Sequence, residues 1–247
     1  MNDPILLHIP HSSTLIPEEN KPDFIVDLSE ELRSMTDWYT DDLFDYPATK
    51  LLFPISRLVC DAERFRDNCR EEMYRRGMGA CYTHGCRGTR IRSLSREKEE
   101  QILRLWYDPH HESLRDKTAE KLDRFGVCLI IDCHSFHASP LPYEPDQRDQ
   151  RPDICIGTDA FHTPGSVAER LTRSFSQKQY DVAVNTPYAG AITPLEYYRK
   201  DPRVISVMIE VNRSLYLDRD FRKNAAFSSV RRDIAASIDE LKAWLGY

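Results

Sequence analysis

Short apolar runs rich in β-branched residues alternate along the chain with longer stretches of helical periodicity. The apolar runs predict strands and the periodic stretches predict helices. The predicted strands cover residues 5–9, 50–55, 127–132, 153–158, 181–185 and 203–211. The clearest predicted helices cover residues 97–124, 165–177 and 218–244. This alternation is typical of an α/β fold with a mostly parallel or mixed central sheet.

Two features interrupt the pattern. Pro109 lies inside the first predicted helix, and because proline has no backbone N–H, that helix is expected to kink or split there. Residues 137–152, "HASPLPYEPDQRDQRP", are rich in proline and charge and directly follow a predicted strand. Long loops inside compact domains often cover functional sites, so this segment is a candidate lid.

Composition favours an ordinary folded protein. The 247 residues are 40% hydrophobic and 30% charged, which fits one folded domain of enzyme size over residues 1–247 rather than two small ones. The formal net charge of -6 argues against a broadly basic nucleic-acid surface. A local basic cluster at residues 70–96 could instead receive a small anion.

The expected compartment is the cytoplasm. The chain has no apolar run of about 18 residues, the length that a membrane span needs. The start, "MNDPILLHIP", has no basic segment of the kind that opens a signal peptide. The seven cysteines contain no C-x-x-C pair, so we expect reduced, mostly buried thiols rather than a zinc finger.

Polar residues follow several predicted strands, at the edge where open α/β sheets bind their ligands. His11 ends the stretch "LLHIPHSS", and His134 lies in "VCLIIDCHSF". Imidazole is a preferred zinc ligand, and a catalytic zinc usually takes three protein ligands. Asp37 or Asp41 of "MTDWYTDDL", one helical turn apart, is expected to supply the third. A supporting role is expected for His8.

Glu210 lies within an otherwise apolar predicted strand. Burying an unpaired carboxylate is costly, so this residue needs a partner or a function. Beside a metal-activated water it would be the general base and later the proton donor of amide hydrolysis. The alternative is a structural ion pair with Arg213.

Other residues are candidate substrate contacts. Arg57 and Arg64 can each form a bidentate clamp on a carboxylate, although surface solvation is an equally strong alternative. Asn185 and Tyr188 of "DVAVNTPYAG" follow a predicted strand and are expected to line the pocket, with Arg213 as a further binding residue.

Seven short motifs together resemble the N-formylglutamate amidohydrolase family. They extend from about residue 5 to about residue 216 and read "IPHSSTLIP", "TDWYTDDLF", "SRLVCDAERFRD", "WYDPHHESL", "IIDCHSF", "NTPYAG" and "IEVNRSLY".

The resemblance implies a three-layer α/β sandwich, similar to the zinc carboxypeptidases and aspartoacylases. It implies a zinc-dependent hydrolase that acts on a formyl or similar amide of a small acidic amino acid. Carried over by motif, one Zn²⁺ would bind His11, His134 and Asp37, with Asp41 in reserve and other divalent ions such as manganese or iron left open, and Glu210 would be the catalytic carboxylate.

The chain also departs from the family pattern. Glu63 in "DAER" stands where an asparagine is expected, and Ser12 and Ser13 replace a small residue and glycine. These changes put the substrate's identity in question. Two alternatives therefore stay open: a metallocarboxypeptidase or deacylase for larger acyl-amino acids or short peptides, and a non-catalytic protein that binds an anion through the basic cluster.

Overall fold

The computed structural model describes residues 3–247 and places six strands in one mixed sheet. The strands are β1 (Ile5–Ile9), β2 (Thr49–Leu52), β3 (Cys128–Phe136), β4 (Ile154–Thr158), β5 (Val182–Val184) and β6 (Val204–Asn212). Their spatial order is β2-β1-β3-β6-β4-β5. The first four in this order are parallel, and β4 and β5 run antiparallel to them.

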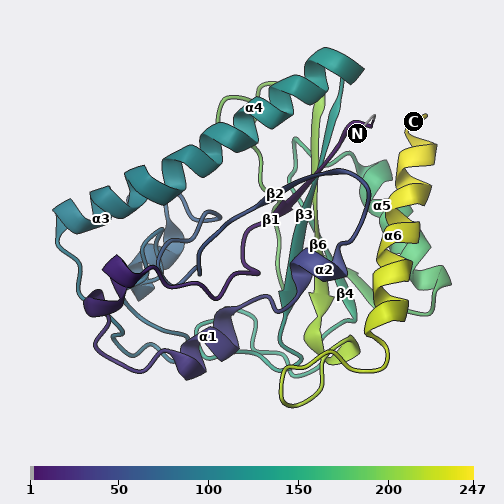
Figure 1. The fold of residues 1–247 in the computed structure, drawn as a ribbon. Helices are drawn as coiled ribbons and strands as arrows, with labels where there is room; N and C mark the ends of the chain where they lie inside the picture. The colour runs from purple at the N-terminus through teal and green to yellow at the C-terminus, as the bar shows by residue number, and fades with distance from the viewer. Residues whose placement is uncertain (1–2) are drawn as a thin grey trace.

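Helices cover both faces of the sheet (Figure 1). They are α1 (Ser29–Met35), α2 (Thr40–Leu43), α3 (Arg96–Ile102), α4 (Asp108–Phe125), α5 (Gly165–Gln177) and α6 (Phe227–Trp244). Short 3₁₀ helices occupy Glu18–Asp23, Glu72–Arg76 and Arg213–Leu215. Helix α4 covers one face, and α2, α5 and α6 pack on the other, which gives the expected three layers.

The alternation of side chains along each strand assigns them to the two faces. Odd-numbered residues of β1 and β3, such as Leu7 and Ile131, pack in the core beneath α5 and α6. Even-numbered residues near the strand starts, such as Leu6 and Ile130, pack beneath α4. The polar residues further along β3 and β6 share this even-numbered face, so the α4 side carries the candidate site.

The long helical segment before β3 does not break at Pro109. A π-helical turn at Leu103–Tyr107 joins α3 to α4, and Pro109 occupies the first turn of α4. The turn accommodates the missing proline N–H, so the segment continues without a split (Figure 1). The Ser95 side chain caps the start of α3, and Gly126, with a φ of 74°, ends α4.

The predicted start of the last helix at residue 218 is wrong. Residues 218–226 form turns because the side chains of Asp218 and Asn224 accept hydrogen bonds from nearby backbone N–H groups. Strand β3 is longer than expected, since pairing with β6 continues to Phe136. His134 therefore lies within a strand rather than after one.

Two further expectations concern the surface and the thiols. Among the described residues, no helix has both the length and the apolar character of a membrane span. The seven cysteines form no disulfide in this structure, and all except the exposed Cys69 are buried, so the expected burial of the thiols is confirmed.

Candidate metal centre

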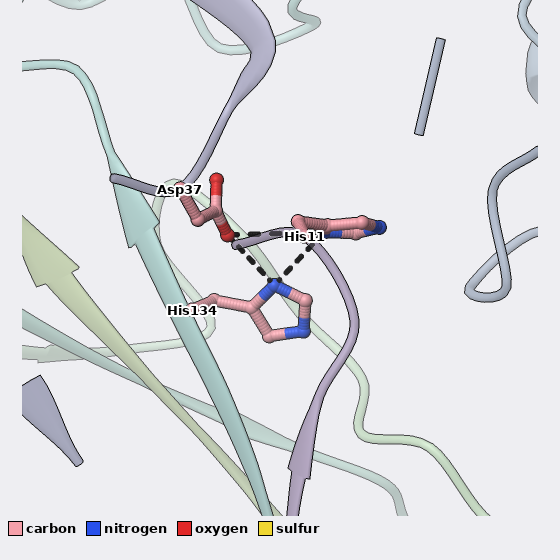
Figure 2. Close-up of side chains that lie close together, drawn as sticks. All are labelled: His11, Asp37 and His134. Carbon is pink, nitrogen blue, oxygen red and sulfur yellow. Dashed lines mark hydrogen bonds and ion pairs between the residues drawn. The ribbon is translucent and has the colours of Figure 1, made fainter. Parts of the chain in front are cut away.

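Three side chains from separate segments converge at the carboxyl end of the sheet. His11 follows β1, His134 lies on β3, and Asp37 precedes α2 (Figure 2). The Nδ1 atoms of His11 and His134 are 3.3 Å apart. Asp37 Oδ2 lies 3.2 Å from His134 Nδ1 and 3.7 Å from His11 Nδ1. All three side chains are buried.

The spacing of these atoms fits one tetrahedral metal ion. With bonds of about 2.0–2.1 Å to zinc, two ligand atoms of a tetrahedron lie about 3.3 Å apart, close to the three observed separations. Asp41 does not take part, because it is exposed on α2. Of the two aspartates considered from the sequence, the structure therefore brings Asp37 to the histidines.

The second nitrogen of each histidine contacts a buried carboxylate. His11 Nε2 lies 2.8 Å from Asp61 Oδ1, and His134 Nε2 lies 3.1 Å from Asp132 Oδ1. If each Nε2 donates its proton to the carboxylate, each Nδ1 keeps a lone pair directed at the other and at Asp37. Three acceptors facing one another need a cation between them, so the donor set fits a metal ion.

Charges around the centre favour the same conclusion. Burial raises the pKa of Asp37, but its contacts with His11, His134 and Arg213 outweigh burial and hold that pKa well below its usual range. Burial lowers the pKa of His134, but Asp132 and Asp37 outweigh burial and raise it well above its usual value. The site therefore attracts positive charge, either a proton or a metal ion.

Further contacts orient the three side chains. Arg213 Nη2 donates to Asp37 Oδ1 at 2.8 Å, which directs Oδ2 toward the histidines. Arg57 donates to Asp61 Oδ2 through Nε and Nη2, at 3.2 and 2.8 Å, and the Tyr82 hydroxyl donates to the same oxygen at 2.5 Å. Asp61 is thus held as a rigid acceptor for His11.

His8 lies on β1, at an even-numbered position of the strand, and contacts residues around the site. Its Nδ1 lies 2.9 Å from Asp132 and 3.1 Å from Glu63, and its Nε2 lies 2.9 Å from His110 Nε2. Burial lowers the pKa of His8, but the two carboxylates outweigh burial and raise it to about 9. Both ring nitrogens of His8 thus contact neighbouring side chains, which fits the supporting role expected from the sequence.

Glu210 is buried beside the three converging side chains. It is the register partner of His134 on the neighbouring strand, and its Oε2 is buried without a hydrogen-bond partner. Burial raises its pKa to about 8. Among residues 3–247 it forms no ion pair, since Arg213 contacts Asp37 instead, and the structural ion pair considered from the sequence is absent.

A cavity of about 220 Å³ opens onto these residues. Its lining includes His11, Asp37, His134 and Glu210. The other predicted residues that line it are Arg57, Arg64, Tyr188 and Arg213. The loop at residues 137–152 contributes His137, Leu141, Tyr143 and Glu144 to the wall of this cavity. Asn185 is the exception: its side chain is exposed and bonded to Thr158, because the chain turns at Asn185 with a φ of 55°.

Sequence reasoning gave no role to Asp61 and Asp132, the two carboxylates behind the histidines. For Asp132 a signal was present: in "IIDCHSF" it stands two positions before His134, and residues i and i+2 of a strand share a face. Asp61 had no local signal, because 50 residues separate it from His11.

Comparisons with known proteins identify the family. The family model described as N-formylglutamate amidohydrolase matches residues 3–217. An N-formylglutamate deformylase of Pseudomonas putida is 24% identical over 228 residues, which are 87% of this chain and 82% of the relative.

Two solved structures have the same fold. The crystal structure of N-formylglutamate amidohydrolase from Ralstonia eutropha matches with a TM-score of 0.83 at 23% identity, over 98% of this chain and 93% of that one. A gene product of Agrobacterium tumefaciens matches with a TM-score of 0.73 at 17% identity, over 99% of this chain and 92% of that one. Because the family model spans most of the sequence, the chain belongs to the N-formylglutamate amidohydrolase family.

Proposed function

We propose that the chain, as a single catalytic domain, is a zinc-dependent amidohydrolase that cleaves the amide of an N-formyl- or N-acyl-amino acid. The observation that carries this proposal is the triangle of His11 Nδ1, His134 Nδ1 and Asp37 Oδ2, with an unpartnered Glu210 carboxylate beside it. The name of the Pseudomonas putida relative makes N-formylglutamate the first substrate to test.

His11, His134 and Asp37 would hold the metal ion. When bound, a divalent ion supplies a Lewis acid that polarises the amide carbonyl and lowers the pKa of water. The contacts of Asp61, Asp132 and Arg213 keep the three ligand atoms oriented, which limits the reorganisation needed on binding. Imidazole and carboxylate ligands suit zinc.

Glu210 would move the proton. Its carboxylate takes a proton from the attacking water and returns it to the nitrogen of the leaving amino acid. The raised pKa supports this role, because a group that titrates near neutral pH can both accept and donate a proton. A cation bound next to Glu210 would lower this pKa toward the working range of a base.

The substrate would be a small acidic acyl-amino acid. Arg57 and Arg64 line the cavity and are suited to a carboxylate, and Tyr188 forms part of the wall. Arg213 also lines the cavity, although its guanidinium already contacts Asp37. We propose the cytoplasm as the compartment, which the seven free thiols support.

Metal analysis combined with a hydrolysis assay tests the proposal. The purified protein is expected to contain about one zinc ion per chain, to release formate from N-formylglutamate, to lose activity with a chelator and to regain it with zinc. Full activity in the presence of a strong chelator would contradict the mechanism. A protein that neither contains nor takes up a metal ion would favour the non-catalytic, anion-binding alternative.

A further inference from the structure

A second cavity of about 300 Å³ adjoins the cavity at the candidate metal centre. Glu63, Arg64, Ala189 and Met208 line both cavities and form the junction between them. A volume of about 220 Å³ lies below the roughly 300–1,000 Å³ of typical small-molecule sites, whereas the two cavities together fall within that range. We call the second cavity the side chamber. It adds space beyond the metal-centre cavity for a group larger than formyl.

The walls of the side chamber are mainly apolar and aromatic. They include Phe65, Tyr107, Ile192, Leu195 and Tyr198. Burying an apolar group against such walls is favourable because it removes apolar surface from water. A bulky apolar group therefore fits this space.

The charges of the side chamber disfavour a carboxylate. Its ionisable carboxyl groups are Glu63, Asp132 and Asp159, and its arginine is Arg64. Glu63 Oε1 is buried without a hydrogen-bond partner apart from its ion pair with His8. Moving the γ-carboxylate of glutamate past Glu63 would bring like charges together and remove water from both.

Arg64 marks where the substrate's α-carboxylate would bind. Its Nε is buried without a hydrogen bond, and its ion pairs with Asp61 and Glu71 span 3.8 and 3.6 Å. By contrast, Arg57 and Arg213 already donate to Asp61 and Asp37 at 2.8 Å. Arg64 thus has donor capacity that its ion pairs do not use, and it lies at the junction between the two cavities.

We propose that the side chamber is a specificity pocket for the amino-acid side chain of the substrate, and that this side chain is apolar rather than acidic. The inference rests on the proposed function and narrows its substrate class to N-formyl or short N-acyl derivatives of amino acids such as leucine. The acidic character of the substrate then comes from its α-carboxylate alone. Glu63, which departs from the family pattern, is the residue that excludes a second carboxylate.

Turnover by the zinc-loaded enzyme tests this assignment. N-formyl-leucine is expected to exceed N-formylglutamate in kcat/KM by about tenfold or more, and Glu63→Gln is expected to narrow this difference. Ala191→Phe narrows the side chamber without touching the metal-centre cavity. It should lower kcat/KM for N-formyl-leucine about tenfold and leave that for N-formylglycine, which has no side chain, within about twofold.

Two further variants guard against an effect on folding. Leu195→Trp fills the side chamber from an exposed wall position and should act like Ala191→Phe. Ala225→Phe adds the same bulk at an exposed loop alanine that lines neither cavity. It should leave kcat/KM unchanged for both N-formyl-leucine and N-formylglycine. Faster turnover of N-formylglutamate, N-formyl-lysine or N-hexanoylglutamate than of N-formyl-leucine would overturn the inference and leave the hydrolase function standing.

Calorimetry on the zinc-loaded Glu210→Gln variant measures binding independently of turnover. The expected result is a Kd for N-formyl-leucine at least about tenfold lower than that for N-formylglutamate. If the wild type hydrolyses none of the acyl-amino acids named above, the proposed function fails. The ratio of the two Kd values then decides the inference by itself. Equal affinities, or tighter binding of N-formylglutamate, would overturn it.

Discussion

His134 and Glu210 are direct register partners on the adjacent parallel strands β3 and β6. Both are even-numbered positions on the face that α4 covers, so the sheet itself sets their side chains next to each other. One is a candidate metal ligand and the other the candidate base. Their relative position depends on strand pairing in the core and not on a loop, as expected for a site that must be pre-organised.

The first prediction concerns Glu210 as a proton carrier. Glu210→Gln keeps the shape of the side chain but cannot accept the proton of water, so kcat should fall by about 10²–10⁴. Zinc content should stay at the wild-type level, because Glu210 is not one of the three converging ligands. Activity within tenfold of wild type would exclude this role.

The second prediction concerns stability and pH in the metal-free protein. In the folded state the pKa of Glu210 is raised from 4.5 to about 8. Between these values the unfolded chain has released the proton that the folded chain retains, so this residue's contribution to stability is lost as pH rises toward 8. Glu210→Gln removes that loss.

The free energy of unfolding is measured with urea for both proteins. From pH 5 to pH 8 it should fall more in the wild type than in Glu210→Gln, so the variant becomes increasingly the more stable of the two. The difference should reach the order of 2–4 kcal/mol. If the difference in stability does not change with pH, the pKa of the Glu210 carboxyl is not raised in the folded protein.

The third prediction separates the two aspartates of "TDWYTDD". Asp37→Ala should abolish tight zinc binding, because it removes one of three ligand atoms. Asp41→Ala is the matched control, since Asp41 is exposed four residues further along and should retain about one zinc ion per chain. Equal zinc content in the two folded variants would contradict the proposed ligand set.

The fourth prediction concerns Asp132, which contacts His134 and His8 at once. Asp132→Asn keeps the size of the side chain but removes the charge that orients both imidazoles. Zinc affinity, measured by competition with a chelating dye, should fall about 10- to 100-fold. Asp116→Asn, on the exposed side of α4, should have no effect, and an unchanged affinity in Asp132→Asn would argue against an orienting role.

The fifth prediction concerns the carboxylate contact of Arg64. Arg64→Lys removes the planar donor pair, so KM should rise about tenfold or more while zinc content stays unchanged. Arg66→Lys is the control two residues away, because Arg66 is bound to Glu100 and Asp108 outside the metal-centre cavity. A similar KM in both variants would remove Arg64 from substrate binding.

The periodicity of the chain was sufficient for the α/β class, because strands and helices bury their apolar residues with different repeats. It also singled out His11, His134 and Glu210 as candidates, since polar residues in or just after apolar runs are costly to bury unless they have a partner or a function. It failed for residues 218–226, where side chains of Asp218 and Asn224 compete with the helix for backbone N–H groups.

Only the tertiary structure decided which residues meet. Asp37 rather than Asp41 reaches the histidines because Asp37 N donates to the carbonyl of His11, a contact between segments that local periodicity cannot predict. The same holds for Asp61 behind His11 and for the side chamber, whose walls come from segments far apart in the sequence. Local pattern depends on each residue's own preferences, whereas the site depends on strand order and packing, which bring distant segments together.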